Sequence, residues 1–371
     1  MAPTSDTSLA LAHDYLLTMR GAERTFAEMA ACWPTAPIYT LLYDERAVAD
    51  GFAGRDVHTS GLQRLGANQR NFRYLLPFFP KAVERLPVGD YDVLVSSSSA
   101  FAHGLRPGPG ALHVCYCHSP FRYAWFEHER ALEETPALGR PLMRRTLKRI
   151  RGWDLEAAGR VSRYVANARI TQERIEQLYG VESEIVHPPV AVERFAIGKP
   201  EDFLLFVGQI VPHKRVEVAL KAAQLAGRPI KVVGEGPDLP RLRELYNRPG
   251  VEFLGSVSDD RLVDLYARCI ALVVPNIEEF GIAAVEAQAA GRPVVGVNRG
   301  GVRETVVDGE TGVLVDGEDA AALAEPLYDL DFGRFDPEAI RANANRFSAT
   351  SFRANFTALV DRYTTKQGAL T

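Results

Sequence analysis

The sequence predicts an α/β protein with two doubly wound parallel sheets. Short apolar runs alternate with longer segments of helical periodicity along nearly the whole chain. Such alternation is typical of parallel sheets that are covered by helices on both faces. The pattern occurs twice, before and after a segment punctuated by Pro and Gly at residues 188–200, which indicates a break between two domains.

The expected strands are short and rich in Val, Ile and Leu, as buried parallel strands are. In the first half they cover residues 8–12, 36–41, 93–96, 112–117, 163–166 and 184–186. In the second half they cover residues 203–207, 230–233, 251–254, 271–274, 294–297 and 312–315. Helices are expected at 22–31, 216–225, 237–248, 259–269 and 282–290, with a final amphipathic helix at 351–363.

We expect a first domain at residues 1–195 and a second domain at 196–350. Ligands of doubly wound sheets bind outside the carboxyl ends of the strands. Two such sheets facing across a cleft would place their polar strand ends together.

Composition excludes several classes of protein. The 371 residues are 46% hydrophobic and 24% charged, which is ordinary for a globular protein. The net charge of −4 argues against nucleic acid as a partner, and no apolar run reaches the ~20 residues of a membrane helix. The N-terminus lacks the pattern of a signal peptide, so the expected compartment is the cytoplasm. Four cysteines without a C-x-x-C pair are expected to serve in packing.

Two glutamates eight residues apart, Glu278 and Glu286, are the most informative feature. Glu286 lies in an Ala-rich apolar helix, where an ionised carboxylate is costly without a polar partner. Ribose hydroxyls are suitable partners. Glu278 lies in the loop after the strand at 271–274 and could meet a sugar. The pair therefore predicts a site that grips both ends of a nucleotide sugar.

Basic residues and glycines stand where helices begin. Lys214 and Arg215 follow the strand at 203–207 and precede a helix, a position that favours an anion such as a diphosphate. The alternative is a solvated Lys-Arg pair. Gly300-Gly301 could approach a phosphate or form a simple turn. Gly21 opens the first helix and could approach phosphate from the other domain.

Two histidines follow strands of the first half. His118 could touch a sugar near the reacting centre, and His103 is a weaker candidate; each could instead be a hydrogen-bonded structural residue. No H-x-x-x-H, H-E-x-x-H or C-x-x-C pattern is present, so we expect no metal.

The segment 140–163 holds eight Arg or Lys residues and two acidic ones, with apolar residues at helical spacing. A core-packed helix with a solvated basic face is the favoured interpretation. A peripheral membrane helix that meets anionic lipid is the alternative. The apolar segment 74–81 could contact a lipid-linked acceptor or pack as a buried loop.

With these residues in view, the chain closely resembles the retaining glycosyltransferases of family 4, which have the GT-B fold. The resemblance runs nearly end to end, and the segment from Glu278 to Glu286 is its most specific part. The run from Cys117 to Trp125 is similar to a bacterial branch that includes O-antigen and exopolysaccharide mannosyltransferases. One departure is Gln209, which stands where the family usually has Arg and cannot neutralise diphosphate charge. We expect Arg215 to replace part of that charge.

The resemblance implies catalytic roles for His118, Lys214 and Glu278. It implies donor contacts for Gly21, Gln209, Lys214, Arg215, Glu278, Phe280, Gly281, Ile282 and Glu286. Weaker acceptor-side candidates are His103, Arg122 and Tyr123. By the resemblance, a C-terminal helix at about 351–371 would return to pack on the first domain. The first domain would hold the acceptor and the second the nucleotide-sugar donor, without a metal or other cofactor.

The implied reaction is transfer of a hexose to an acceptor hydroxyl in glycan or glycolipid assembly, with retention of anomeric configuration. GDP-mannose is the favoured donor, followed by a UDP-hexose; the acceptor would be a glycan, a lipid-linked glycan or a small molecule. A sugar-nucleotide epimerase and a phosphorylase on the same fold are alternatives, as is a non-catalytic or weakly active nucleotide-sugar-binding protein.

Overall fold

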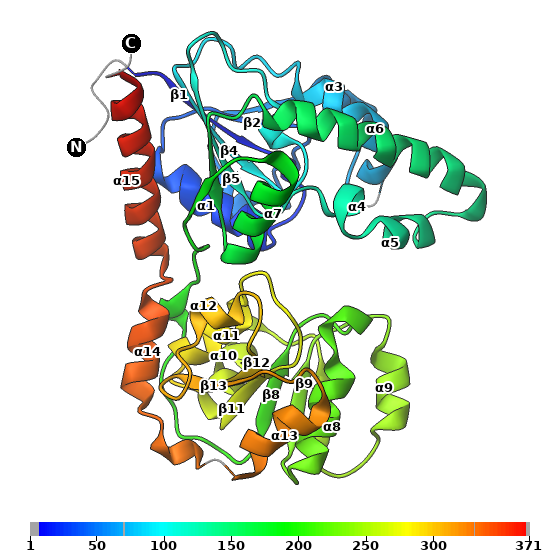
Figure 1. Ribbon diagram of the computed structural model, residues 1–371, viewed down its shortest axis with the longest axis vertical. Helices are drawn as coiled ribbons and strands as arrows, with labels where there is room; N and C mark the ends of the chain where they lie inside the picture. Colours follow the sequence, from blue (N-terminus) through cyan, green and yellow to red (C-terminus); the bar gives the residue numbers. More distant parts are fainter. Residues whose placement is uncertain (1–6, 70, 330, 369–371) are drawn as a thin grey trace. The chain divides into compact units, whose positions relative to one another are not determined.

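The computed structural model describes residues 7–69, 71–329 and 331–368. The chain forms two compact units. Unit 1 comprises Met1–His187 and Phe352–Thr371, and unit 2 comprises Pro188–Ser351. Each unit has its own parallel sheet and its own hydrophobic core (Figure 1).

Unit 1 contains a seven-stranded sheet in the order β3-β2-β1-β4-β5-β6-β7, and every neighbouring pair is parallel. Its strands are β1 (Leu9–His13), β2 (Ile38–Thr40), β3 (Val57–Thr59), β4 (Val93–Ser98), β5 (Leu112–Cys117), β6 (Arg163–Ala166) and β7 (Ser183–Ile185). The chain order reverses between β1 and β4. The carboxyl ends of β1 and β4 therefore mark the edge at which doubly wound sheets bind ligands.

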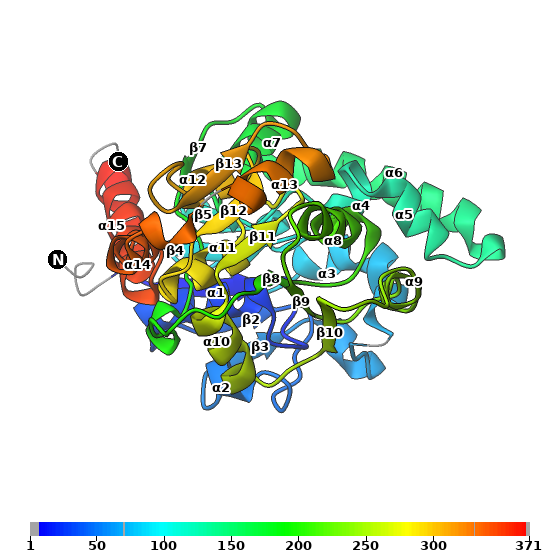
Figure 2. The same ribbon diagram turned by 90° about the horizontal axis from the view of Figure 1, so that it is seen from below.

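Helices cover both faces of this sheet (Figure 2). They are α1 (Gly21–Cys32), α2 (Ala49–Phe52), α3 (Phe79–Val83), α4 (Arg122–Trp125), α5 (His128–Glu133), α6 (Arg140–Ala158) and α7 (Arg169–Tyr179). The 3₁₀ segments are η1 (Gly61–Leu65), η2 (Phe72–Phe78), η3 (Ala102–Gly104) and η4 (Ala137–Gly139). Phe26 and Met29 of α1 enter the core on one face, and Leu147 and Ile150 of α6 enter the core on the other.

The last helix, α15 (Ala349–Gly368), belongs mostly to unit 1. Its residues Phe352, Phe356, Leu359 and Val360 are buried in the same core as Met29. The Tyr363 hydroxyl donates to Glu184 Oε1 at 2.7 Å beside β7. The far end of the sequence therefore completes the hydrophobic core of the first half.

Unit 2 contains a six-stranded parallel sheet in the order β10-β9-β8-β11-β12-β13. Its strands are β8 (Leu204–Val207), β9 (Ile230–Val233), β10 (Val251–Gly255), β11 (Ala271–Val274), β12 (Val294–Val297) and β13 (Gly312–Val315). The reversal of chain order falls between β8 and β11. The loops that follow these two strands therefore define the ligand-binding edge.

The helices of unit 2 are α8 (Val216–Leu225), α9 (Leu239–Leu245), α10 (Asp259–Arg268), α11 (Ile282–Ala289), α12 (Val302–Thr305), α13 (Ala320–Asp329) and α14 (Pro337–Asn345). Three further 3₁₀ segments are η5 (Val192–Arg194), η6 (Pro212–Lys214) and η7 (Phe332–Arg334). Helices α8 and α13 pack on each other and on one face of the sheet, around Ala219, Leu220 and Leu323.

The prediction of two doubly wound parallel sheets is confirmed. All twelve predicted strands occur, and no strand end differs from its predicted position by more than two residues. Strand β3 was missed, because Val57-His58-Thr59 is short and only partly buried. The four cysteines are free, and three of them are buried, as expected for packing residues. In the described ranges, no helix is both long and apolar enough to span a bilayer.

Candidate functional site

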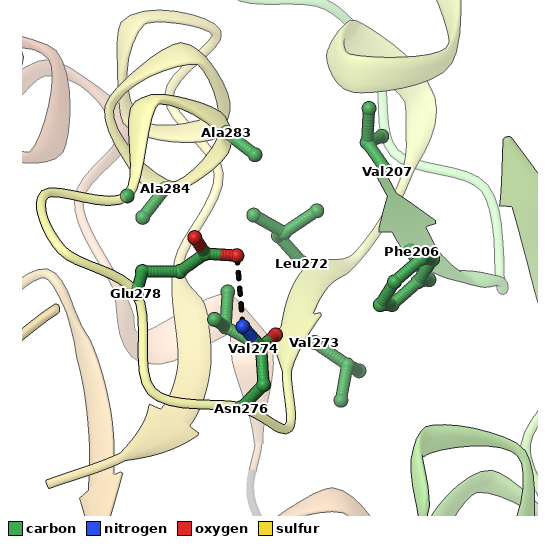
Figure 3. A pocket seen from close by; sticks show the side chains of 10 residues that line it. Phe206, Val207, Leu272, Val273, Val274, Asn276, Glu278, Ala283 and Ala284 are labelled. Carbon is green, nitrogen blue, oxygen red and sulfur yellow. Dashed lines mark hydrogen bonds between the residues drawn. The ribbon is translucent and has the colours of Figure 1, made fainter. Parts of the chain in front are cut away.

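The strongest candidate site lies at the reversal point of the unit 2 sheet. A small pocket opens there beside β8, β11 and the start of α11 (Figure 3). Its lining combines apolar strand residues with two polar side chains, Asn276 and Glu278. Among the lining side chains, Asn276 and Glu278 are the two that can form hydrogen bonds, so they determine which polar groups the pocket can bind.

Lys214 and Glu278 meet at this edge. The Lys214 Nζ donates to both carboxylate oxygens of Glu278, at 2.6 and 2.7 Å, although 64 residues separate them. Asn276 Nδ2 donates to Glu278 Oε1 at 3.0 Å, as Figure 3 shows. The side chains of Lys214 and Glu278 are 23% and 25% exposed, so water screens the pair only in part. The fold thus brings together Lys214 and Glu278, which were predicted from the sequence as a cation and a carboxylate of the site.

Backbone geometry holds the Glu278 loop in place. Gly281 adopts φ 90°, a left-handed conformation, immediately before α11 begins at Ile282. The Gly301 N–H donates to the Glu278 carbonyl at 2.8 Å. A Cβ atom on Gly300 or Gly301 would collide with the backbone of residues 278–280. The two adjacent glycines therefore serve close packing against this loop, whereas the sequence suggested a phosphate approach or a simple turn.

Glu286 has a polar partner inside the protein. The hydroxyl of Tyr266, which is fully buried on α10, donates to Glu286 Oε2 at 2.9 Å. Burial and the neighbouring Glu286 charge raise the pKa of Tyr266 well above its usual value, so the hydroxyl stays a donor. This contact explains how a carboxylate is tolerated in an Ala-rich helix.

Arg215 has its own partner at the start of α8. Its guanidinium donates to Glu318 twice, to Oε2 at 2.7 Å and to the backbone carbonyl at 2.5 Å. Glu318 also pairs with Arg299, with Oε1 2.8 Å from Nη1. Arg215 has φ 52°, and it is the one non-glycine residue in the described ranges with positive φ. Its contact with a diphosphate stays a prediction, as does that of Gln209, whose side chain is exposed.

The remaining predicted donor residues lie around the same loop of unit 2 or at the start of α1 in unit 1. The Phe280 ring is buried and packs against Phe347 at 5.5 Å, so it anchors the loop. Ile282 is 39% exposed at the first position of α11. Gly21 is exposed at the first position of α1, where the Arg20 N–H donates to Glu23 Oε2 at 3.1 Å.

In unit 1, His118 lies at the carboxyl end of β5 next to the reversal point. Its Nε2 lies 2.8 Å from Ser97 Oγ, and the same hydroxyl lies 3.1 Å from His13 Nδ1. Burial, with smaller contributions from His13 and Arg122, lowers the pKa of His118 to about 3. His118 is therefore neutral near pH 7 and can donate or accept a hydrogen bond. It is too weak a base at that pH to take up a proton.

His103 lies deeper in unit 1 than the prediction of an acceptor contact requires. It is 3% exposed, and its Nε2 lies 3.3 Å from Asp154 Oδ1. Asp154 is fully buried and accepts hydrogen bonds from Trp125 and Tyr179, each at 2.8 Å. This cluster ties α4, α6 and α7 together. A direct acceptor contact of His103 would require this buried cluster to open.

The other acceptor-side candidates lie on α4. Arg122 is exposed, and the Tyr123 hydroxyl donates to Glu134 Oε2 at 2.9 Å. Their role with an acceptor stays a prediction.

Asp14 is a polar residue whose role the sequence did not reveal. It is 2% exposed and accepts the backbone N–H groups of Ser99, Phe101 and Ala102 at 2.6 to 2.8 Å. These bonds shape the loop after β4 beside the reversal point. The position of Asp14 directly after β1 was the feature of the sequence that could have indicated this role. Among the described residues, no group of three or more His, Cys, Asp or Glu side chains is arranged to hold a metal ion.

Two family models match the chain. Residues 19–194 match the model described as "Glycosyltransferase Family 4", and residues 191–344 match "Glycosyl transferases group 1". The two matched ranges together cover both units, including His118 in the first and Lys214, Glu278 and Glu286 in the second.

Curated relatives include D-inositol 3-phosphate glycosyltransferases. The protein of Streptomyces coelicolor is 30% identical over 336 residues, which are 68% of this chain and 72% of the relative. The protein of Streptomyces avermitilis is 33% identical over 231 residues, which are 53% of this chain and 49% of the relative. The chain thus spans about half the length of several relatives that it matches.

Solved structures share the fold at low sequence identity. Anabaena HepE in complex with UDP has a TM-score of 0.69 and 16% identity, covering 96% of this chain and all of the other. Sucrose-phosphate synthase from Thermosynechococcus elongatus has a TM-score of 0.69 and 16% identity, covering 97% of this chain and all of the other. With the two parallel sheets and the Lys214–Glu278 edge, these findings establish that the chain belongs to glycosyltransferase family 4 and has the GT-B fold.

Proposed function

We propose that this protein is a retaining glycosyltransferase that moves a hexose from a nucleotide sugar to an acceptor hydroxyl. The observation that carries the proposal is the contact of Lys214 with Glu278 at the reversal point of the unit 2 sheet. A cation that can meet a diphosphate and a carboxylate that can meet sugar hydroxyls stand there side by side. Glu286, oriented by Tyr266, would accept the ribose hydroxyls.

Donor binding would exchange partners at this site. Lys214 would turn from Glu278 to the diphosphate, and Glu278 would then be free to accept hydrogen bonds from sugar hydroxyls. Asn276, which donates to Glu278, would keep the carboxylate oriented during the exchange. This exchange makes donor binding sensitive to both residues, since each partner must be released before it can bind the ligand.

The transfer step would rest on electrostatic stabilisation. The bond between the anomeric carbon and the diphosphate oxygen breaks, and Lys214 stabilises the negative charge on the departing oxygen. The acceptor oxygen attacks from the same face and forms the new bond, and its proton passes to the leaving diphosphate. Attack on the face of departure retains the anomeric configuration. No metal takes part in this proposal.

The donor would be a nucleoside diphosphate hexose. GDP-mannose remains the first candidate from the sequence, and a UDP-hexose is the second. UDP and UDP-glucose are the ligands named for the HepE structures, which supports testing both bases. A thermal-shift screen would rank the nucleotides, since a bound ligand stabilises in proportion to the logarithm of its occupancy ratio. The proposed acceptor is a glycan, a lipid-linked glycan or a small molecule.

The decisive experiment incubates the protein with each donor and candidate acceptors and analyses the products by NMR. We expect a new glycosidic bond with retained anomeric configuration and release of nucleoside diphosphate. Glu278→Gln should lower kcat/KM roughly 100-fold, because the neutral amide accepts hydrogen bonds from sugar hydroxyls through one oxygen and without charge. Glu325→Gln, on the exposed face of α13, is the matched control. Near-normal turnover by Glu278→Gln would refute the proposal.

The same assay separates the alternatives. An epimerase would convert the donor sugar without an acceptor. A non-catalytic binding protein would bind nucleotide sugar but release no nucleoside diphosphate. A phosphorylase would require inorganic phosphate to cleave a glycosidic bond.

A further inference from the structure

The start of α6 is strongly basic and carries no compensating acid. From Arg140 to Trp153 the sequence has six Arg or Lys residues and no Asp or Glu, in a chain whose formal net charge is −4. Four of these cations are exposed and have no hydrogen bond or ion pair with any residue that the structure describes: Arg144, Arg145, Lys148 and Arg149.

Some surface arginines of this chain pair with acidic side chains. Arg241 contacts Asp238 and Glu217, and Arg268 contacts Glu201 and Asp264. Such pairing is the usual way to reduce the repulsion and hydration demands of clustered surface charge. On α6, by contrast, four cations without a partner in the described part of the chain lie within six residues, so they offer concentrated positive charge to an external partner.

Large apolar side chains stand among these cations. Leu138 is 100% exposed in η4, directly before α6, and Leu142 is 67% exposed in the first turn. Leu142, Arg145 and Arg149 are spaced by three and four residues, so they share one face of the helix. The opposite face is fixed in the core of unit 1 by Leu147 and Ile150, which are 0% and 2% exposed.

The helix also extends beyond the body of its unit. Both views show the end of α5 and the start of α6 projecting together from unit 1 (Figures 1 and 2). The Arg140 Nε donates to the Thr135 carbonyl at 3.2 Å, which closes the connection between the two helices. The exposed side chains of the first turns of α6 therefore lie at a projecting end of unit 1.

We propose that this surface, the basic tip (Leu138, Leu142, Arg144, Arg145, Lys148 and Arg149), docks on membranes that contain anionic lipid. The cations meet lipid phosphates and other anionic head groups, and the two leucines enter the boundary between head groups and acyl chains. Burial of exposed leucine is favourable only with a partner that has an apolar layer. That requirement favours a bilayer over nucleic acid, whose outer surface is a row of phosphates.

The size of the effect follows from the charges. Each Lys or Arg close to an anionic membrane strengthens binding roughly fivefold. Removal of two cations should therefore weaken binding roughly 25-fold, and added salt should weaken it further because exposed charges are screened. Replacement of the leucines should weaken binding at every salt concentration, because apolar insertion does not depend on screening.

The test is co-sedimentation of the full chain with vesicles of phosphatidylcholine alone or with about one third phosphatidylglycerol. We expect binding only to the anionic vesicles. Arg145→Gln/Arg149→Gln should weaken it roughly 25-fold, and Leu138→Ser/Leu142→Ser should also weaken it. The matched control, Arg46→Gln/Arg261→Gln, removes two exposed arginines outside α6 and should bind as the unmodified protein does. Vesicle binding needs neither donor nor acceptor, so it can fail while the proposed glycosyl transfer succeeds.

Three outcomes would overturn the proposal. They are equal binding to neutral and anionic vesicles, unchanged binding by Arg145→Gln/Arg149→Gln, and binding to an oligonucleotide with none to anionic vesicles. Unchanged thermal unfolding of the variants would show that any loss of binding arises at the surface, since all the substituted side chains are exposed.

Discussion

The contact of Arg215 with Glu318 can be tested by two substitutions that remove the same ion pair in different ways. Glu318→Gln removes the carboxylate, so Arg215 and Arg299 both lose an ion pair, although Arg215 keeps its hydrogen bond to the backbone carbonyl of residue 318. Arg215→Gly removes the guanidinium and also the left-handed strain at φ 52°. The two variants should therefore differ in stability, although both break the Arg215–Glu318 pair.

The magnitudes follow from exposure and geometry. The Arg215 and Glu318 side chains are 32% and 33% exposed, so partial screening limits their pair to about 1 kcal/mol. A non-glycine residue in the left-handed region costs about 1 kcal/mol, which glycine regains. Glu318→Gln should destabilise unit 2 by about 1–1.5 kcal/mol, whereas Arg215→Gly should be close to neutral.

Thermal unfolding followed by circular dichroism provides the measurement. The difference of about 1 kcal/mol corresponds to a difference in Tm of roughly 2–4 °C for a unit of this size. Arg299→Gln is the control, and it should change stability by less than about 0.5 kcal/mol because the Arg299 side chain is 60% exposed. If Arg215→Gly lowered Tm as much as Glu318→Gln does, the left-handed conformation would carry no strain and the reasoning would fail.

Three further predictions concern buried or exposed polar groups. Tyr266→Phe should destabilise the protein by about 1.5 kcal/mol, because the Glu286 carboxylate loses a buried hydrogen-bond donor. The same variant should bind nucleotide more weakly in a titration. Unchanged stability together with unchanged nucleotide affinity would contradict the role of this contact. Burial lowers the pKa of His113 and of His118 to about 3 from an ordinary 6.5, so the unfolded chain binds more protons between these values. The contribution of these two histidines to the free energy of unfolding should therefore be fully present above pH 6.5. It should fall as pH decreases toward 3, by roughly 1.4 kcal/mol per histidine per pH unit, as measured by urea unfolding. His113→Asn should reduce this dependence of the free energy of unfolding on pH. Gln209→Arg should not abolish transfer, because its exposed position has room for a second cation; a complete loss of donor binding would place Gln209 elsewhere in the site.

Much of the candidate site could be predicted because its residues follow strands. Lys214 and Glu278 each stand in a loop after a short apolar strand, and parallel strands present their carboxyl ends along one edge. The rule for doubly wound sheets then brings the two loops together at the reversal point. The partners of these residues could not be predicted. Glu318 lies 103 residues from Arg215, outside any recognised pattern.

The histidines show where position along the chain is insufficient. His118 and His103 both lie at the ends of strands, and the sequence treated both as candidates for ligand contact. Packing separates them: His118 lies next to Ser97 at the reversal point, whereas His103 is enclosed with Asp154 beneath α4, α6 and α7. Both rings are buried, so the two histidines differ in their partners, which depend on the segments that meet at each place and are not encoded by local sequence.

The sequence by itself determined the two parallel sheets, the loops that carry Lys214 and Glu278, and the basic face of α6, because these depend on local periodicity and residue type. The tertiary structure alone decided which charges pair. It joins Lys214 to Glu278 and Tyr266 to Glu286, and it leaves the cations of the basic tip without partners among the described residues. Hydrogen bonds and ion pairs act over a few ångströms, so they depend on how distant segments of the chain meet in space.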